Sequence, residues 1–152
     1  MANNCLEVHI MDINSGLNIQ NGIKIKWNSN FEDTINICKV NNIDFILKAI
    51  GKTKKISIPI EFANIGKVLA NIYFINDLIS EISISSITSY NFSVENYTLI
   101  DKKLIQYFGK PKKTKKNKTI WKFGRIRIKH YFIDRDGVLA DYLVLENSFS
   151  RT

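Results

Sequence analysis

The chain has 152 residues, of which 45% are hydrophobic and 24% charged, a composition typical of an ordinary globular protein and not of a disordered or fibrous one. Cys5 and Cys38 offer no disulfide framework, and no apolar run reaches the roughly 18 residues of a membrane-spanning helix. We expect a single domain, residues 1–152, that folds without metal or cofactor. The start lacks the features of a signal peptide, so, unless the chain has already been processed, we expect a cytoplasmic protein without membrane contact.

The net charge of +8 is concentrated in one part of the chain. Residues 101–135 contain 13 of the 22 Lys and Arg residues but only 2 of the 14 acidic residues, which leaves the rest slightly acidic. A basic patch attracts anionic partners and speeds their encounter. The chain is rich in Ile, Asn and Lys together, as AT-rich coding sequences tend to be. This bias accounts for much of the lysine content but not for its clustering.

The first predicted elements are strands. Loose alternation predicts a strand at residues 6–11, and Asn21-Gly22 lies between two alternating runs within residues 18–27. Both turn residues accept a positive φ, so this dipeptide is a strong hairpin signal. We therefore expect a hairpin that turns at Asn21-Gly22.

The first helix is predicted by a capping pattern. Ser29 and Glu32 have the S-x-x-E spacing of a capping box, in which two side chains satisfy unpaired backbone N–H groups. A helix is then expected at about residues 30–40. Its buried side would carry Phe31, Ile35 and Cys38.

A series of antiparallel strands follows. Residues 43–50 fit a helix or a strand, and the strand is weakly favoured. Residues 56–60 alternate but contain Pro59, which cannot donate to a sheet ladder, so that strand should lie at an edge or end there. Strands at 68–75 and 78–86 are expected around the turn residues Asn76-Asp77, with Ile82 and Ile84 facing inward, and a polar loop at 88–96 follows.

The second half starts with the best-marked helix, at about residues 97–108. Gly109 supplies the left-handed cap and Pro111 prevents continuation. The apolar stripe would be Leu99, Ile100, Leu104, Tyr107 and Phe108. Residues 110–118 are a loop by composition, and strands are expected at 119–123, 125–133 and 138–146.

These elements predict an α+β fold, a mainly antiparallel sheet of about seven to nine strands with two helices. In both halves a helix precedes antiparallel strands, but the residues of the two halves do not align well enough to define an internal repeat.

Candidate metal and catalytic residues are few. Asp134, Asp136 and Gly137 fit part of a calcium loop, but that frame places Phe132 and Leu143 at the first and last ligand positions, so a hairpin turn is expected instead. Cys5 and His9 are too few ligands for a zinc site.

Two side chains remain for nucleophilic or acid–base chemistry. His130 should share a face with Ile126, Ile128 and Phe132 as a partly buried core residue, and Cys38 should be an inert packing residue. No phosphate loop or hydrolase motif occurs. An enzyme is therefore the least favoured class, with a site around His130 or Cys38 as the remaining possibility.

The basic region gives the main candidate site. Strict alternation places Arg125, Arg127, Lys129 and Tyr131 on one face of a strand, opposite core isoleucines. With the neighbouring lysines, the candidate partner-binding residues are Lys112, Lys113, Lys115, Lys116, Lys118, Lys122, Arg125, Arg127, Lys129 and Tyr131. Such a surface can bind phosphates or a partner's carboxylates. The alternative is a solvated sheet face beside a flexible lysine loop.

The stretch from Leu99 to Glu146 combines a helix that ends in Tyr107-Phe108-Gly109-Lys110-Pro111, a strand with Trp121, and a strand that leads into Asp134-Arg135-Asp136-Gly137. This arrangement resembles small bacterial immunity proteins of contact-dependent inhibition and related polymorphic-toxin systems. The resemblance implies a cytoplasmic, non-catalytic α+β protein that binds and neutralises one cognate toxin, and it transfers no functional residue. Many such proteins are acidic, whereas this chain is basic, so its toxin should present an acidic surface or contact the acidic part of the chain.

A nucleic-acid-binding domain that uses the basic surface of residues 110–131 is the alternative function. The sequence lacks the aromatic pattern of an RNA-recognition motif and a helix-turn-helix signature, which places this function second.

Overall fold

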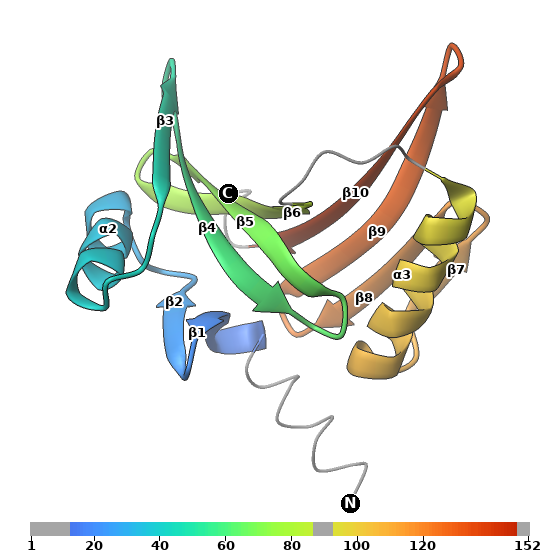
Figure 1. Ribbon diagram of the computed structural model, residues 1–152, viewed down its shortest axis with the longest axis horizontal. Coiled ribbons are helices and arrows are strands. Elements are labelled where there is room, and N and C mark those ends of the chain that lie inside the picture. Colours follow the sequence, from blue (N-terminus) through green and yellow to red (C-terminus); the bar gives the residue numbers. More distant parts are fainter. Residues whose placement is uncertain (1–12, 87–92, 149–152) are drawn as a thin grey trace, which may run out of the picture.

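The computed structural model describes residues 13–86 and 93–148, so the predicted strand at residues 6–11 lies outside the described residues. Within these ranges the chain forms a helical turn at residues 13–15, two longer helices and ten strands, which are arranged in a two-stranded and an eight-stranded sheet (Figure 1). The predicted α+β fold with a mainly antiparallel sheet is confirmed. The described strands outnumber the predicted seven to nine because one expected loop contains a short strand.

The small sheet is the predicted hairpin. It consists of β1 (Gly16–Gln20) and β2 (Ile23–Lys26), which pair antiparallel. Asn21 has φ 40° and Gly22 has φ 82°, so both turn residues adopt the left-handed conformation that the sequence indicated.

Helix α2 (Phe31–Val40) has the predicted bounds but a different cap. The N-cap is Asn30, whose side-chain oxygen accepts a hydrogen bond from the backbone N–H of Asp33 at 2.8 Å, while the Asp33 carboxylate accepts one from the Asn30 N–H. The predicted capping pair of Ser29 and Glu32 is therefore wrong by one residue. An Asn–Asp pair performs the same function, because both side chains are strong hydrogen-bond acceptors at a helix start. Ile35 and Cys38 are buried as expected.

Four strands follow α2 in the sequence, and they lie side by side in the sheet in the same order. They are β3 (Ile46–Ile50), β4 (Thr53–Phe62), β5 (Gly66–Ile75) and β6 (Leu78–Ser85). The ambiguous segment at residues 43–50 therefore contains a strand. The β5–β6 turn is at Asn76-Asp77 as predicted, and Ile82 and Ile84 are buried.

Strand β4 continues past Pro59 instead of ending there. Its pairing with β3 ends at Ser57, whereas its pairing with β5 continues to Phe62. At Pro59 the strand therefore has one described neighbour, so the missing N–H removes no hydrogen bond to a second described strand. The residue is locally at an edge although most of β4 is not.

Helix α3 (Val94–Phe108) begins three residues before the predicted helix start. The Ser93 hydroxyl caps it by accepting the Asn96 N–H at 3.0 Å. Gly109 ends it with the expected positive φ, 87°, but its ψ of −162° differs from that of the expected left-handed cap. Tyr97, which the predicted apolar stripe did not include, is buried, whereas Leu99, which was expected on that side, is 56% exposed.

The last four strands are β7 (Lys113–Lys115), β8 (Lys118–Phe123), β9 (Ile126–Arg135) and β10 (Val138–Asn147). The prediction of a loop at residues 110–118 is wrong, because the segment turns at residues 116–117 and β7 pairs with β8. Lysine side chains are compatible with a short outer strand, where they remain solvated and discourage further pairing. The β9–β10 turn at Asp136-Gly137 has two positive φ angles and is the expected hairpin turn.

The order of the large sheet is β3-β4-β5-β6-β10-β9-β8-β7, with all neighbours antiparallel. Each half of the chain forms a helix and then a four-stranded meander, and the last strands of the two meanders, β6 and β10, pair at the centre. The order is thus the same from either edge. The two halves of the chain therefore share the same topology, although their residues do not align as an internal repeat.

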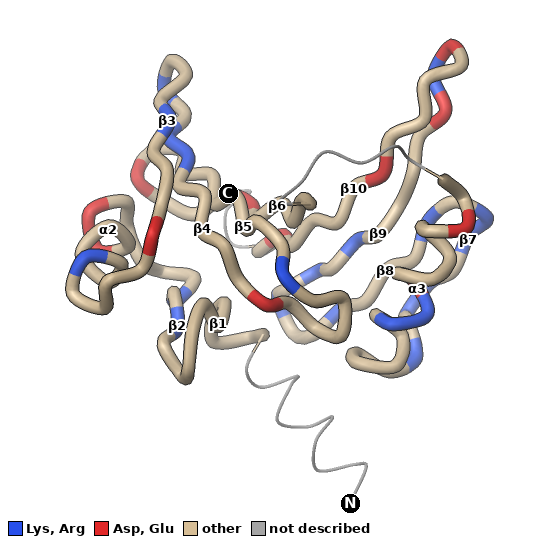
Figure 2. The backbone as a smooth tube through the Cα atoms, in the orientation of Figure 1, with Lys and Arg blue, Asp and Glu red and all other residues tan. Residues whose placement is uncertain are grey.

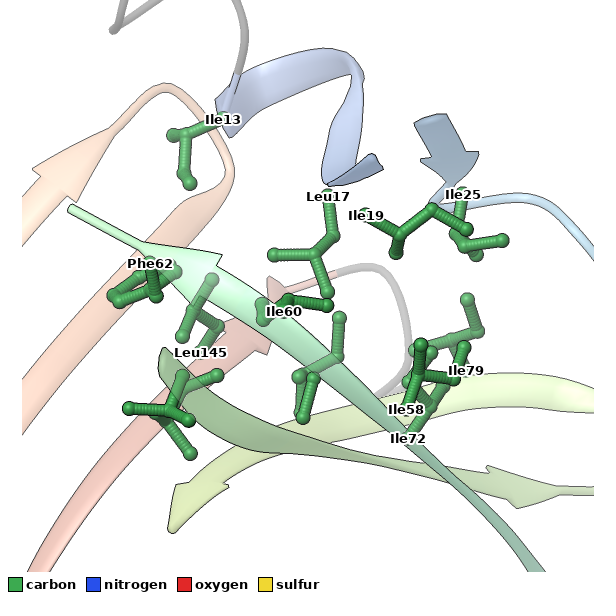
Figure 3. Packing of buried hydrophobic residues seen from close by; sticks show 14 of the residues in the cluster. Ile13, Leu17, Ile19, Ile25, Ile58, Ile60, Phe62, Ile72, Ile79 and Leu145 are labelled. Carbon is green, nitrogen blue, oxygen red and sulfur yellow. The ribbon is translucent and has the colours of Figure 1, made fainter. Parts of the chain in front are cut away.

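The core lies against one face of the large sheet. The β1–β2 hairpin packs over β4, where Leu17, Ile19 and Ile25 meet Ile58 and Ile60 (Figure 3). Helix α2 contributes Phe31, whose ring meets Phe74 of β5 edge-on at 5.5 Å. Helix α3 contributes Phe108, whose ring lies 5.8 Å from that of Trp121 in β8.

In the part of the chain that the structure describes, no helix combines the length and the apolar character needed to cross a membrane.

Candidate functional site

The two faces of the large sheet differ in what covers them. The buried hydrophobic cluster of β4, β5, β6, β8, β9 and β10 points toward α2, α3 and the β1–β2 hairpin. Alternate residues of the same strands point to the opposite face. We call this the open face, because no described helix or strand packs against its side chains. Its central residues are Ser57, Leu69, Asn71, Tyr73, Glu81, Ser83, Lys118, Ile120, Lys122, Arg127, Lys129, Tyr131, Tyr142, Val144 and Glu146.

The strip predicted on β9 lies on the open face. Arg127, Lys129 and Tyr131 are half-buried there, while Ile126 and Ile128 are buried on the core face. Arg125 is not part of this strip, because it lies in the turn between β8 and β9, before the strand begins.

Several predicted lysines reach the same face from neighbouring strands. Strand pairing sets Lys122 opposite Arg127 and Lys118 opposite Tyr131, and directly opposite residues share a face. Lys115 lies opposite Lys118, and Lys113 lies opposite Ile120. Lys112 and Lys116 flank β7, and both are exposed. Seven of the ten predicted residues therefore share the open face. Basic residues gather along the chain near β7 and β8, at one edge of the sheet (Figure 2).

The strip is less positive than the sequence suggested. The Lys129 ammonium lies 3.1 Å from the Glu146 carboxylate, and Glu146 lies directly opposite both Arg127 and Glu81. Sequence alternation could place Glu81 and Glu146 on a strand face but could not place both beside Lys129, because that requires β6 and β10 to pair. The centre of the open face is therefore of mixed charge, and the net positive charge lies toward β7 and β8.

The Glu81 carboxyl group gives this centre a dependence on pH. Burial raises its pKa, the Glu146 carboxylate raises it further, and Lys129 opposes both. A carboxyl group with a raised folded-state pKa stabilises the fold at low pH, and this contribution is lost as the pH rises through that pKa. At neutral pH the ionised pair Glu81–Glu146 should therefore cost stability.

We expect Glu81→Gln to raise the free energy of unfolding at neutral pH by about 0.2–1 kcal/mol, because it removes a like charge directly opposite Glu146. The gain should vanish well below the ordinary pKa of glutamic acid, where the wild-type side chain is already neutral. Urea unfolding at both pH values measures the difference. The exposed Glu61, opposite Lys67, is the matched control, and its change to glutamine should give no gain. A gain from Glu81→Gln that is equal at both pH values would contradict this explanation.

Aromatic side chains extend the open face beyond the charged centre. The rings of Tyr131 and Tyr142 stack with centroids 5.2 Å apart, and the Lys118 ammonium lies 5.4 Å from the centre of the Tyr131 ring. Burial raises the pKa of Tyr131, and Tyr142, Glu81 and Glu146 add to the effect. Tyr142 was missed in the sequence, and the alternation of β10 was the signal that placed it on this face. It is 41% exposed, so the pair presents a large apolar surface with polar tips.

A polar network fixes the face between β4 and β6. The Asn71 side chain accepts a hydrogen bond from the Ser57 hydroxyl at 2.7 Å and donates to the Ser83 carbonyl and the Ser85 hydroxyl at 3.1 and 3.0 Å. Asn71 is 7% exposed and Ser57 is 3% exposed. Satisfied buried amides hold neighbouring strands in register, so this half of the face should be rigid.

His130 has the structural role that the sequence favoured. It is 1% exposed, its Nδ1 lies 2.8 Å from a carboxylate oxygen of Asp101, and Tyr97 stacks on its ring at 4.1 Å. The Tyr97 hydroxyl donates to the His130 carbonyl. The ring is thus held by its neighbours on the core face, although it also borders a cavity of about 560 Å³ between α3 and the β6–β10 junction.

Cys38 is fully buried, and burial raises the pKa of its thiol. A thiol of raised pKa is a poor nucleophile, which agrees with a packing role. Cys5 and His9 lie outside the described residues. Within residues 13–86 and 93–148, no group of three or more His, Cys, Asp or Glu side chains could hold a metal ion.

The fold and the site together define an α+β protein whose antiparallel sheet has one face covered by helices and a hairpin and one face that no described element covers. Comparison with protein-family models, with curated proteins and with solved structures finds no match to this chain.

Proposed function

We propose that this chain is a non-catalytic binding protein that neutralises a cognate bacterial toxin by occlusion. The observation that carries the proposal is the open face, on which no described helix or strand packs. Stacked tyrosines and apolar side chains lie there beside the Lys129–Glu146 ion pair, whose side chains are 17% and 19% exposed. Tyr and Arg are typical of the residues that contribute most to protein interfaces. A broad sheet face can cover a partner's active site without performing any chemistry.

A protein partner fits this face better than nucleic acid does. Glu81 and Glu146 lie in the middle of the face and would repel a phosphate backbone. Tyr142 and Ile133 offer apolar area farther along β10 and β9, and they are 41% and 40% exposed. Interfaces between proteins combine such apolar anchors with a charged rim.

The lysines near β7 would then act mainly during the encounter. Lys112, Lys113, Lys115 and Lys116 are exposed, and exposed charges change association rates more than they change contact energies. They favour a toxin whose docking surface is acidic. The same lysines are the observation that favours the alternative function, a nucleic-acid-binding domain.

The test of this function is co-expression with the product of the gene immediately upstream. Growth that is inhibited by the upstream product alone and restored by this chain, together with co-purification at moderate salt, is the expected result. A harmless upstream product, or a toxic one that neither binds nor is neutralised, would overturn the proposal. Nucleic-acid binding would instead weaken log-linearly as salt rises and tolerate many sequences.

Charge reversal then tests which part of the open face meets the partner. We expect the double variant Lys113→Glu and Lys122→Glu to slow association by about tenfold while it leaves the dissociation rate nearly unchanged, because both side chains are exposed rim charges. Surface plasmon resonance separates the two rates. The double variant Lys26→Glu and Lys39→Glu, at exposed positions of β2 and α2, changes the net charge equally and is the matched control. An equal slowing by this control would mean that net charge and not this face governs the encounter.

A further inference from the structure

The two outer strands of the large sheet differ sharply. Strand β7 has three residues, two of which are lysines, whereas β3 has five residues and all of them are exposed. Ile46, Leu47 and Ile50 of β3 are 67%, 48% and 64% exposed. Edge strands are normally short, charged or covered. Strand β3 is charged at one position only, and its apolar side chains stand out on both faces.

The backbone of β3 offers a second row of hydrogen-bonding groups. In an antiparallel strand, alternate residues direct N–H and C=O groups away from the paired neighbour. In the described part of the chain β3 pairs with β4 alone, so this row lies along the edge of the sheet. Register with β4 places Ile46, Lys48 and Ile50 on the open face and Leu47 and Ala49 on the other face. An added strand would meet both sets.

The charge around β3 indicates what kind of strand fits. Residues 45–60 contain four lysines and no acidic residue. Lys48 lies directly opposite Lys55, so two like charges are already adjacent on the open face. Basic residues lie along β3 and β4 toward the tip of their hairpin (Figure 2). Pairing β3 with β3 of a second copy would bring two such hairpins together, whereas an acidic strand would relieve the repulsion.

We propose that β3 binds an extended segment of a protein partner as an added antiparallel strand, with an acidic side chain opposite Lys48 and apolar side chains opposite Ile46 and Ile50. Backbone hydrogen bonds supply affinity in such strand addition, and alternate side chains supply specificity. This site lies at the far edge of the sheet from β7. The inference goes beyond the proposed function, because it holds whether or not the partner is a toxin.

A capped synthetic peptide, acetyl-Glu-Val-Thr-Glu-Val-Val-Glu-amide, tests the site on the whole protein. Its central glutamate would lie opposite Lys48 in the antiparallel register. We expect a dissociation constant below about 1 mM, measured by NMR titration, with the largest amide shifts in residues 46–50. Amide protons on the outer side of β3 should exchange more slowly when the peptide is bound. Absence of binding, or shifts that centre on residues 112–118, would overturn the proposal.

Three controls separate strand addition from simple charge attraction. The same peptide with N-methyl groups at consecutive central residues keeps its charge but cannot donate along either edge, so it should lose binding. Lys48→Glu should weaken binding of the original peptide by about tenfold and should favour a peptide with lysine at the centre. Lys115→Glu, at the opposite edge of the sheet, should change the affinity by less than about twofold, because salt screens the interaction between distant exposed charges. Binding of the N-methylated peptide that equals that of the original would overturn strand addition.

The oligomeric state tests whether a second copy of this chain, and not a separate partner, binds to β3. Light scattering should find a monomer at the concentration of the titration. A dimer that Lys48→Glu strengthens or Ile46→Thr abolishes would show that a second copy occupies β3, and it would overturn the proposal of a separate acidic partner.

Discussion

Replacement of Trp121 by alanine is expected to lower the free energy of unfolding by about 3–5 kcal/mol, which is the range for truncation of a large buried aromatic residue. Trp121 is fully buried in β8 and meets the ring of Phe108 at 5.8 Å. Its indole N–H donates to the Gly109 carbonyl at 2.9 Å, at the residue that ends α3. The side chain therefore joins the helix end to the sheet, and its loss leaves both a cavity and an unsatisfied carbonyl. Urea unfolding measures the change.

Trp121→Phe separates the two contributions. The phenyl ring keeps much of the packing but cannot donate to Gly109, so we expect a smaller loss of about 1–2 kcal/mol. A loss below about 1 kcal/mol for Trp121→Ala would contradict the buried position of this side chain, since cavities of that size are not tolerated so cheaply.

Gly16→Ala is expected to destabilise the protein by about 2–4 kcal/mol, because overpacking against a fixed backbone costs more than a strained φ alone. A Cβ at Gly16 would overlap the carbonyl oxygen of Ile25 and lie 2.9 Å from its carbonyl carbon, and both are backbone atoms of the paired strand β2. The hairpin can relieve the overlap only if β1 and β2 separate. Because this hairpin packs over β4, separation would also disturb the core.

Gly22→Ala is the matched control in the same hairpin. Gly22 has φ +82° and a Cβ there would meet nothing within 4 Å, so only the cost of a left-handed alanine, about 1 kcal/mol, is expected. Thermal unfolding of the two variants under identical conditions gives the comparison. Equal destabilisation would show that backbone conformation and not the contact with Ile25 restricts Gly16.

The candidate site could be predicted from the sequence only in part. Alternation along β9 correctly placed Arg127, Lys129 and Tyr131 on one face, because side-chain direction in a strand is a local property. It could not reveal that Glu146 neutralises Lys129 or that Tyr142 stacks on Tyr131, because both contacts depend on the register between separate strands. The exposed edge of β3 could not be predicted either, because residues 43–50 fitted a helix as well as a strand and the strand order was unknown.

The sequence by itself determined three hairpin turns of this protein and the residue at which α3 ends. Three hairpins turn at residue pairs that tolerate a positive φ, namely Asn21-Gly22, Asn76-Asp77 and Asp136-Gly137. Gly109 ends α3 because glycine also tolerates a positive φ. Only the tertiary structure decided that β6 pairs with β10, that Pro59 lies inside a long strand and that residues 113–115 form an outer strand. Turn chemistry acts over a few residues, whereas the choice of strand neighbours depends on how all the apolar faces can be buried together.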